Sequence, residues 1–535
     1  MALIEFEKVS FGYPEKDLYE NISFTIEPGE HAVLIGSNGC GKSSLVHLLM
    51  DEEKYTYEGL IRRSGDFRSG DFRTGYVGQF VEHETGDATV FDFLAKPFVD
   101  LLGESDALAQ KMGEAENPDK LYEEFQVLMD RIDAVDGYNY EANIRKQLHT
   151  AGLSAIEENS VGSVSGGEYK LLYIIRNMLL KPQLLIMDEP DVFLDFENLI
   201  GLVHLINSYD GTVLTITHSR LLLSQCFDKV LHIENMQLQE YAGSYPEYSR
   251  WLLETRIDVF EVTKDFDDYI EAQQQLVNRL RKGAEFTSDP KKGKQLQARK
   301  KLVERMKTLR GEDPFLEIPN HSFAFPDVTP EDGIAFTVEN YSLAYKDELL
   351  RDVSFTVNKG DKIAVVGANG TGKSSILRDI YRMLSEKENG DKVGYFRQIT
   401  ESDDTLQLSG GERNMAQLEE ICRGDYDTLL LDEPTSHLDC DAQIALEQAL
   451  TEYRGTVLMV SHDFFTVTDC AQRIFILENG TLREMSGRAY RKSIYKKYFG
   501  SDIFEQERNR IDTERKVNRL ILKNKFDEAR EVLGV

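Results

Sequence analysis

Residues 36–43 read GSNGCGKS, and this octapeptide decides the fold because it fits the pattern GxxxxGK[ST] directly after the apolar run AVLIG. The pattern predicts a loop between a buried strand and a helix. Glycines let the backbone approach phosphate groups closely, and free amides at the start of a helix form an anion-binding nest. We therefore predict a phosphate-binding loop in an α/β nucleotide-binding domain.

The loop is part of a long internal repeat. GANGTGKS occupies residues 367–374, and NISFTIEPGEHAVLIGSNGCGKSSL at 21–45 aligns with DVSFTVNKGDKIAVVGANGTGKSSI at 352–376. Both halves continue with a Gln after a short strand, then SGGE, then an apolar strand ending in DEP, and last a His after another strand. Continuous apolar strands such as LLIMDE and LLLLDE are typical of parallel strands buried on both faces. The sequence thus predicts two α/β domains of the phosphate-loop type.

Each phosphate loop supplies candidate ligands for ATP and Mg²⁺. We expect Lys42 and Lys373 to contact the β- and γ-phosphates, and Ser43 and Ser374 to bind Mg²⁺. The candidate ATP-binding loop residues are Gly36, Ser37, Asn38, Gly39, Cys40, Gly41, Lys42, Ser43 and Ser44 in the first copy, and Gly367, Ala368, Asn369, Gly370, Thr371, Gly372, Lys373, Ser374 and Ser375 in the second.

The remaining repeated polar residues have predicted roles in hydrolysis. Asp188 and Asp432 end apolar strands, where a carboxylate can hold the Mg²⁺ shell, and the next residues, Glu189 and Glu433, are candidates to polarise the attacking water. His218 and His462 each follow a strand and are candidates to reach the γ-phosphate. A lone His of this kind is more often structural, but its repetition in the same order favours the catalytic reading.

Two further pairs complete the predicted sites. Gln79 and Gln398 are candidates to sense the γ-phosphate and the metal. Tyr13 and Tyr345 stand where an aromatic ring can stack on adenine.

These motifs in this order resemble the ATP-binding cassette family. VSGGE at 164–168 and LSGGE at 408–412 match that family's signature, and the resemblance covers essentially the whole chain. Two cassettes on one chain, a linker of about 80 residues, YAGSYPEY at 241–248 and KGKQLQARKKLVERM at 292–306 are similar to the F subfamily in particular.

The resemblance implies a monomer whose two cassettes close head to tail on two ATP molecules, each site combining one phosphate loop with the other cassette's signature. Site one would then join the loop of Lys42 to Ser409, Gly410 and Gly411. Site two would join the loop of Lys373 to Ser165, Gly166 and Gly167. ATP binding would close the pair and hydrolysis would reopen it.

The two copies differ after the catalytic Glu, because DEPDVFLD at 188–195 faces DEPTSHLD at 432–439. Asp191 replaces Thr435, Val192 replaces Ser436 and Phe193 replaces His437. We expect the extra carboxylate of Asp191 to raise the pKa of Glu189 or to compete for the metal, which makes site one the slower site. Neutral substitution is the alternative.

The domain plan follows from the same landmarks. We expect cassette one at 1–247, with a helical subdomain at about 81–160, a helical hairpin linker at 248–333, cassette two at 334–500 and a C-terminal helix at 501–535. Gln398 and Ser409 stand so close together that cassette two has almost no helical subdomain, which the family normally carries. In the last helix, the candidate docking residues are Leu520, Ile521, Val532 and Leu533.

Positive charge is concentrated in the linker. The chain has a net charge of −31, yet residues 281–310 hold eleven Lys or Arg and three acidic residues, a net of +8. Such a segment on an acidic body can place its charge on nucleic-acid phosphates, although a solvated spacer has the same composition. The candidate contacts to rRNA or tRNA are Lys291, Lys292, Lys294, Arg299, Lys300 and Lys301. GRAYRKSIYKKYFG at 487–500 is a weaker candidate.

The F-subfamily resemblance implies a ribosome-binding ATPase that acts on translation, by remodelling stalled ribosomes or by protecting them from antibiotics. The five scattered cysteines, the lack of an export signal and the lack of a long apolar run favour a cytoplasmic protein with no membrane segment. An ATPase subunit of a membrane transporter and a DNA-maintenance ATPase are the alternatives.

Overall fold

The computed structural model of the chain describes residues 2–14, 16–64, 73–83, 86–114, 119–285, 297, 300–301, 314–318, 323–329, 332–344, 348–386, 392–397, 410–499 and 503–535. Contacts divide the chain into two compact units. The first consists of Met1–Ser244 and His321–Ser501, and the second of Tyr245–Asn320 and Asp502–Val535.

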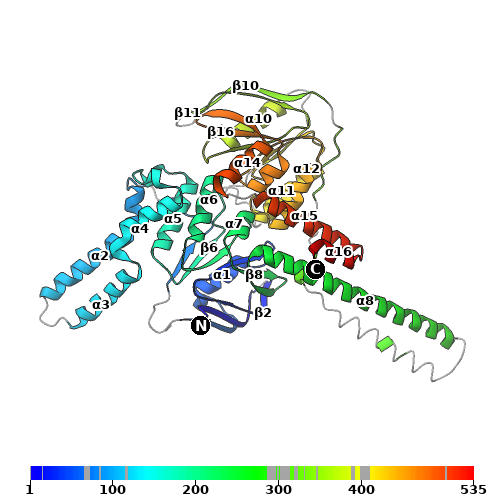
Figure 1. Cartoon of the computed structure of the whole chain (residues 1–535), viewed down its shortest axis with the longest axis horizontal. Coiled ribbons are helices and arrows are strands. Elements are labelled where there is room, and N and C mark those ends of the chain that lie inside the picture. Colours follow the sequence, from blue (N-terminus) through cyan, green and yellow to red (C-terminus); the bar gives the residue numbers. More distant parts are fainter. Residues whose placement is uncertain are drawn as a thin grey trace. The chain divides into compact units, whose positions relative to one another are not determined.

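The first unit contains two six-stranded sheets with the same topology (Figure 1). In each sheet five strands run parallel and one antiparallel strand, β9 or β17, closes an edge. The first sheet has the order β5 (Thr74–Val77), β6 (Leu184–Asp188), β7 (Thr212–Ile216), β3 (His31–Gly36), β8 (Lys229–Glu234) and β9 (Gln237–Ala242). The second has the order β13 (Val393–Phe396), β14 (Thr428–Asp432), β15 (Thr456–Val460), β12 (Lys362–Gly367), β16 (Arg473–Glu478) and β17 (Thr481–Ser486). The predicted α/β fold with two phosphate-loop cassettes is confirmed.

The central strands are buried on both faces, as their sequences require. Every residue of β6, β7, β14 and β15 is buried. Runs such as LLIMD and TLLLD therefore read as apolar throughout, because helices cover both sides of a parallel sheet.

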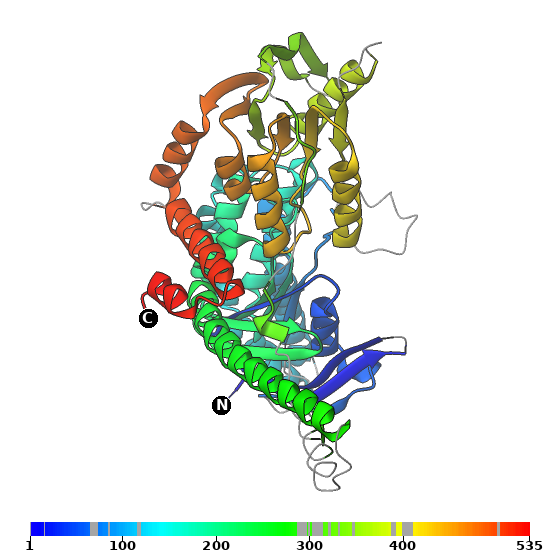
Figure 2. The ribbon, with the colours of Figure 1, turned by 90° about the vertical axis from the view of Figure 1, so that its right-hand side faces the viewer.

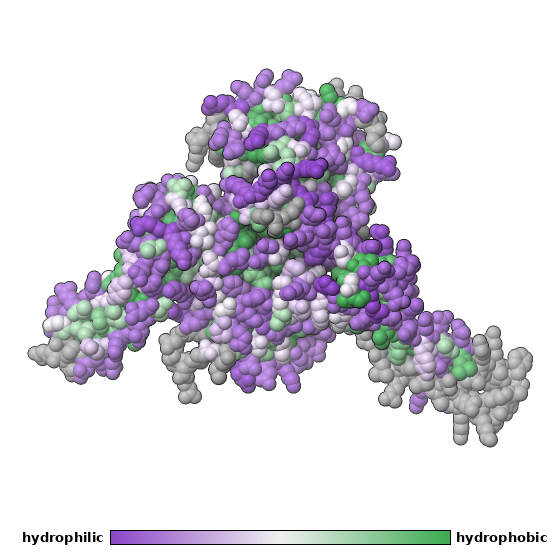
Figure 3. Space-filling view, viewed as in Figure 1, coloured by the Kyte–Doolittle hydropathy of each residue, from purple (hydrophilic) through white to green (hydrophobic). Residues whose placement is uncertain are grey.

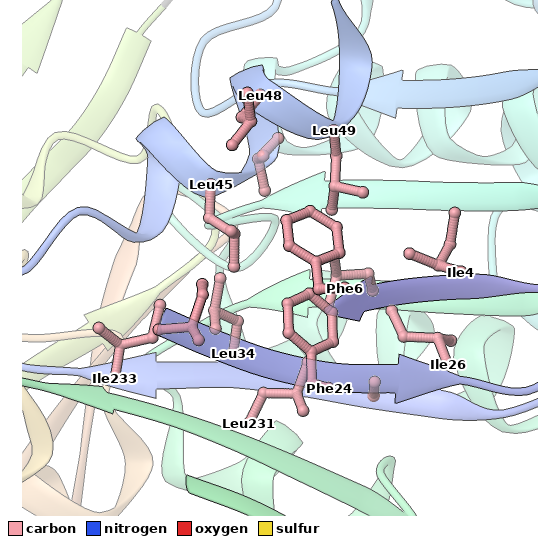
Figure 4. Packing of buried hydrophobic residues seen from close by; sticks show 14 of the residues in the cluster. Ile4, Phe6, Phe24, Ile26, Leu34, Leu45, Leu48, Leu49, Leu231 and Ile233 are labelled. Atoms are coloured by element: carbon pink, nitrogen blue, oxygen red, sulfur yellow. The ribbon is translucent and has the colours of Figure 1, made fainter. Parts of the chain in front are cut away.

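A small antiparallel sheet packs on each phosphate-loop helix. The first consists of β1 (Ile4–Tyr13), β2 (Lys16–Ile26) and β4 (Glu58–Arg63), and the second of β10 (Ile334–Ala344) and β11 (Glu348–Asn358). In the first, Phe6 and Phe24 stack with ring centroids 4.4 Å apart, and Leu34 of β3 and Leu45 of α1 lie in the same buried cluster (Figure 4). This packing fixes the strand and the helix that flank the phosphate loop.

The helices of the first unit differ in number between the cassettes. Cassette one has α1 (Lys42–Met50), α2 (Val90–Glu114), α3 (Asp119–Ala134), α4 (Tyr140–Thr150), α5 (Gly166–Leu179), α6 (Phe196–Asn207) and α7 (Arg220–Gln225). Cassette two has α10 (Lys373–Ser385), α11 (Gly410–Arg423), α12 (Cys440–Glu452), α13 (Phe464–Cys470) and α14 (Gly487–Tyr498). Helices α2 and α3 form a hairpin whose surface mixes hydrophobic and hydrophilic side chains (Figures 1 and 3). Residues 398–409, where cassette two has its short connection, lie outside the described residues.

The second unit is helical. Its elements are α8 (Tyr245–Glu285), α15 (Ile503–Leu522) and α16 (Phe526–Leu533). Helices α15 and α16 lie against α8 (Figure 2). Leu253 and Ile257 of α8 pack against Val517, Ile521 and Phe526 of the C-terminal helices. The predicted docking residues Leu520, Ile521, Val532 and Leu533 all belong to this cluster.

The C-terminal segment forms two helices rather than one. Asn524 adopts a φ of 56°, a left-handed conformation that cannot continue an α-helix. Phe526 can then turn into the cluster while α15 keeps its own contacts with α8.

Candidate nucleotide site

The phosphate loops have the same backbone in both cassettes. Gly36 and Gly367 adopt φ angles of 150° and 154°. A Cβ on Gly36 would lie 2.2 Å from Ile233 O, and one on Gly367 would lie 2.6 Å from Leu477 O. Both positions therefore require glycine, and the loops pass close to the neighbouring strand before α1 and α10 begin.

The loop lysines are held over their own loops. Lys42 Nζ donates to Gly36 O at 2.8 Å and to Ser37 O at 3.0 Å. Lys373 Nζ donates to Gly367 O at 2.8 Å and to Ala368 O at 2.7 Å. Both ammonium groups are nearly buried at the start of a helix. This arrangement is a cradle for anionic phosphate.

The predicted metal-binding oxygens lie together in each cassette. Ser374 Oγ donates to Asp432 Oδ1 at 2.9 Å, and Ser43 makes the corresponding hydrogen bond to Asp188. Burial raises the pKa of both aspartates. Hydroxyl and carboxylate oxygens are the ligands that Mg²⁺ prefers, so these pairs fit that ion. Among the described residues, no three His, Cys, Asp or Glu side chains gather into a metal site, so Mg²⁺ here would also need phosphate oxygens and water.

The signature of cassette one meets the phosphate loop of cassette two. Ser165 caps α5 in a capping box, since Ser165 N donates to Glu168 Oε2 at 2.7 Å and Glu168 N donates to Ser165 Oγ at 3.3 Å. A Cβ on Gly167 would lie 3.4 Å from Asn369 Nδ2. A cavity of about 780 Å³ is lined by Ser165 and Glu168 on one side and by Ala368 and Asn369 on the other. The lining does not include Lys373 or Ser374, so this cavity borders the predicted site two and does not contain its phosphate-binding side chains.

The loops that follow the catalytic glutamates cross between the cassettes. Asn38 Nδ2 donates to His437 O at 2.9 Å, and Asn369 Nδ2 donates to Phe193 O at 2.7 Å. The backbone of Asn369 also donates to Asp195 Oδ2 at 3.2 Å. Each phosphate loop is therefore bonded to the crossing loop of the other cassette.

The carboxylates predicted to be catalytic, Glu189 and Glu433, and both predicted histidines line one small cavity of about 130 Å³. Burial lowers the pKa of His218 to about 4 and of His462 to about 3, and the charge of the loop lysine adds to this in each case. The imidazoles are therefore neutral at pH 7. Among the described residues, His218 Nε2 is buried without a hydrogen-bond partner, so it is poised for a group such as a phosphate oxygen.

The two catalytic carboxylates have different electrostatics. Burial raises the pKa of Glu433 to about 8. Burial acts in the same direction on Glu189, but the hydrogen bond with His437 and the charges of His218, His437 and Lys42 together lower its pKa below the ordinary value. The expectation that Asp191 raises the pKa of Glu189 is therefore wrong.

Asp191 instead lies in a buried polar environment that sequence reasoning missed, where the charge of Lys170 acts on its carboxyl. It accepts a hydrogen bond from Thr217 Oγ1 at 2.5 Å, and burial raises its own pKa to about 6. The buried Lys170, whose positive charge opposes that rise, donates to Gln79 O, Glu189 O and Val192 O at 3.0, 2.8 and 3.2 Å.

The second copy replaces Lys170 and Asp191 by neutral residues. Asn414 stands five residues after Ser409, as Lys170 stands five after Ser165, and its Nδ2 donates to Ser436 O at 2.5 Å. Lys170 with Asp191 thus corresponds to Asn414 with Thr435. Comparison of the two repeats contained this signal, because both changes fall at matching positions.

A buried ion pair also joins the cassettes. Arg220 NH1 donates to Glu447 Oε2 at 3.0 Å, NH2 contacts Glu447 Oε1, and NH2 lies 3.3 Å from Asp463 Oδ2. The guanidinium also lies over the ring of Phe465, 4.8 Å from its centroid. At the matching positions of the repeat the chain has Phe464 for Arg220 and Val203 for Glu447, so this pair exists on one side only.

The remaining predicted residues fall partly within and partly outside the described residues. Tyr13 ends β1 and is 43% exposed, and its ring makes an edge contact with that of Phe11, the centroids 5.3 Å apart. Gly410 and Gly411 begin α11. Lys300 and Lys301 are exposed and helical. The candidates outside the described residues are Tyr345, Gln398, Ser409, Lys291, Lys292, Lys294 and Arg299.

Comparisons with known proteins agree with this geometry. A family model described as ABC transporter matches residues 19–192 and 350–401, and a second with the same description matches 231–321. The chain is 28% identical to the uncharacterized ABC transporter ATP-binding protein YfmM of Bacillus subtilis, over 90% of this chain and 100% of that protein. It is 26% identical to the energy-dependent translational throttle protein EttA of Escherichia coli, over 92% of this chain and 96% of that protein.

A solved structure shares the twin-cassette fold. The archaeal ribosome recycling factor aABCE1, crystallised with the ribosomal stalk protein aP1, matches with a TM-score of 0.50 and 16% identity over 91% of both chains. That likeness supports the fold.

Proposed function

Since the chain belongs to the F subfamily of the ATP-binding cassette family and is an ATPase, we propose that it is a cytoplasmic, ribosome-associated factor whose ATP-bound, closed state acts on translation. The observation that carries the proposal is the similarity to EttA, which spans nearly the full length of both chains.

The roles of the site residues follow the geometry. We assign ATP binding to the two phosphate loops, with Lys42 and Lys373 turned from their loop carbonyls to phosphate oxygens. Ser43 with Asp188, and Ser374 with Asp432, would hold Mg²⁺, which neutralises phosphate charge when bound. Glu189 and Glu433 orient the attacking water in this proposal, and the neutral His218 and His462 contact the γ-phosphate.

The basic linker segment supplies the proposed contact with rRNA and tRNA. Its net charge of +8 contrasts with the net charge of −31 of the chain, so phosphate groups attract the segment while they repel the remainder. Remodelling of stalled ribosomes and protection of ribosomes from antibiotics are the two translation roles that this contact can serve.

A subunit of a membrane transporter is the competing reading, because the matching family models carry that description. None of the helices in the described part of the chain is long and apolar enough to cross a membrane.

Sedimentation with ribosomes tests the proposal. The double variant Glu189→Gln, Glu433→Gln is expected to co-sediment with ribosomes in ATP and to remain in the supernatant without it. Changing Lys291, Lys292, Lys294, Lys300 and Lys301 to Gln in this background is expected to abolish co-sedimentation. The charge-matched control changes five exposed cations of the C-terminal region to Gln, namely Arg508, Lys516, Arg519, Lys523 and Lys525, and is expected to retain it. Failure of the trapped protein to pellet in ATP would refute ribosome binding and leave the ATPase assignment intact.

A further inference from the structure

The two crossing loops have equivalent backbones and different side chains. Phe193 and His437 occupy matching positions, and both adopt left-handed φ angles, 67° and 59°. Both carbonyls accept a hydrogen bond from the Asn of the opposite phosphate loop. Since a bulky residue rarely adopts this conformation, the fold holds each of these side chains in a set direction towards the opposite cassette.

The side chain of His437 reaches the catalytic carboxylate of cassette one. His437 Nδ1 lies 3.5 Å from Glu189 Oε2 and 3.3 Å from Gln79 Nε2. Gln79 Nε2 in turn donates to Glu189 Oε2 at 2.7 Å. The side chains of His437 and Glu189 are only 15% and 20% exposed, so the three polar groups form a compact cluster with little water.

Phe193 cannot do the same for the other cassette. Its ring has no hydrogen-bonding group and lies 5.7 Å from the ring of Phe80 and 6.5 Å from that of His437. Glu433 is instead oriented by its own cassette, because His462 N donates to Glu433 Oε2 at 3.1 Å and His462 Nε2 lies 3.5 Å from Oε1.

We propose that His437 is a positioning residue which cassette two supplies to Glu189, and that site one alone depends on such a residue. His437 fixes the rotamer of Glu189 through the shared contact with Gln79. Opening of the cassettes withdraws this support, so hydrolysis at site one is tied to closure, whereas Glu433 keeps its support in either state. The proposal concerns the ATPase reaction and is independent of ribosome binding.

Single-turnover ATP hydrolysis, with enzyme in excess over ATP, tests the proposal because it measures the rate of the chemical step even at a site that turns over slowly. In the Glu433→Gln background, His437→Phe is expected to slow the chemical step about 10- to 100-fold, the size of effect that a misplaced catalytic group produces. The enzyme concentration giving half-maximal rate is expected to change less than about threefold, since no phosphate contact is removed. His437→Gln, which keeps a hydrogen-bonding side chain, is expected to recover most of the rate.

The reciprocal background and the matched position provide the controls. In the Glu189→Gln background, His437→Phe is expected to change the rate less than about twofold, the range left when a removed side chain does not contact the working site. Phe193→His makes the same exchange at the equivalent position; because the Phe193 ring contacts that of His437, a loss at site one smaller than that of His437→Phe is expected. Equal losses in both backgrounds, or equal losses for His437→Phe and His437→Gln, would overturn the proposal and assign His437 a general packing role.

Discussion

Loss of Arg220 is expected to open the interface between the cassettes. The side chains of Arg220 and Glu447 are 1% and 8% exposed, and Glu447 also accepts a hydrogen bond from Thr466 Oγ1 at 2.6 Å. Arg220→Met leaves Glu447 buried without its cation, and removal of one partner of a buried pair costs about 3–5 kcal/mol. Separation of the cassettes returns Glu447 to water, so the cost cannot exceed the free energy of opening.

The reverse single variant and the double variant separate the pair from its surroundings. Glu447→Met still leaves Arg220 next to Asp463, so we expect a smaller loss, about 1–3 kcal/mol. Burial raises the pKa of Glu447 despite the opposing charge of Arg220, which indicates that desolvation offsets much of the attraction. The double variant Arg220→Met, Glu447→Met is therefore expected to be about as stable as the wild type.

Hydrogen exchange of the α7 and α12 amides, followed by mass spectrometry, measures this opening. A cost of about 3 kcal/mol corresponds to roughly 150-fold faster exchange where opening exposes the amides. The double variant should return exchange to within about fivefold of the wild type. Additive effects of the two single variants would refute the reasoning, since they would show that the two side chains do not interact.

Three further outcomes are expected. The double variant Lys170→Asn, Asp191→Thr, which introduces the second copy's residues, should destabilise the protein less than either single change. Thermal unfolding should give a coupling energy of about 1–3 kcal/mol between the two changes. A coupling energy of zero would show that the two charges are independent. Burial lowers the pKa of Lys362 to about 7, so between pH 7 and the ordinary pKa of 10.5 the unfolded state binds more protons than the folded state. Wild-type stability should therefore rise over that pH range, and the stability advantage of Lys362→Met at pH 7 should shrink towards pH 10. A stability difference that does not change with pH would contradict the lowered pKa. Phe526→Ala should cost about 3–5 kcal/mol in the α8–α15–α16 cluster and speed exchange in α16, with the exposed Leu522→Ala as the matched control that should have little effect.

The sequence predicted those features that depend on neighbouring residues. The glycines of GSNGCGKS predict a loop that passes too close to its neighbours for residues with a Cβ. The uniformly apolar strands predict a buried parallel sheet. The fold class, the family and the ATPase activity are confirmed. The slower turnover of site one stays a prediction.

Contacts between distant residues could not be predicted in the same way. The expectation for Asp191 considered only its nearest charged neighbour in sequence, Glu189, whereas burial and the hydrogen bond from Thr217 act on the Asp191 carboxyl more strongly. The sequence identifies His437 only as a residue that differs from its counterpart in the repeat, Phe193. Nothing in a single sequence shows that its side chain reaches a carboxylate 248 positions away. The break at Asn524 depends on one left-handed residue in an otherwise helical pattern.

The ion pair between Arg220 and Glu447, which has no counterpart on the other side, also affects which cassettes can pair. Two copies of the first half would place one Arg220 against a Val203 on each side, and two copies of the second would place Glu447 against Phe464. Either assembly would bury charges without partners, and only the unlike combination joins the guanidinium to the carboxylate. The interface thus favours pairing of the first cassette with the second. It disfavours pairing of two first cassettes, or of two second cassettes, from different chains.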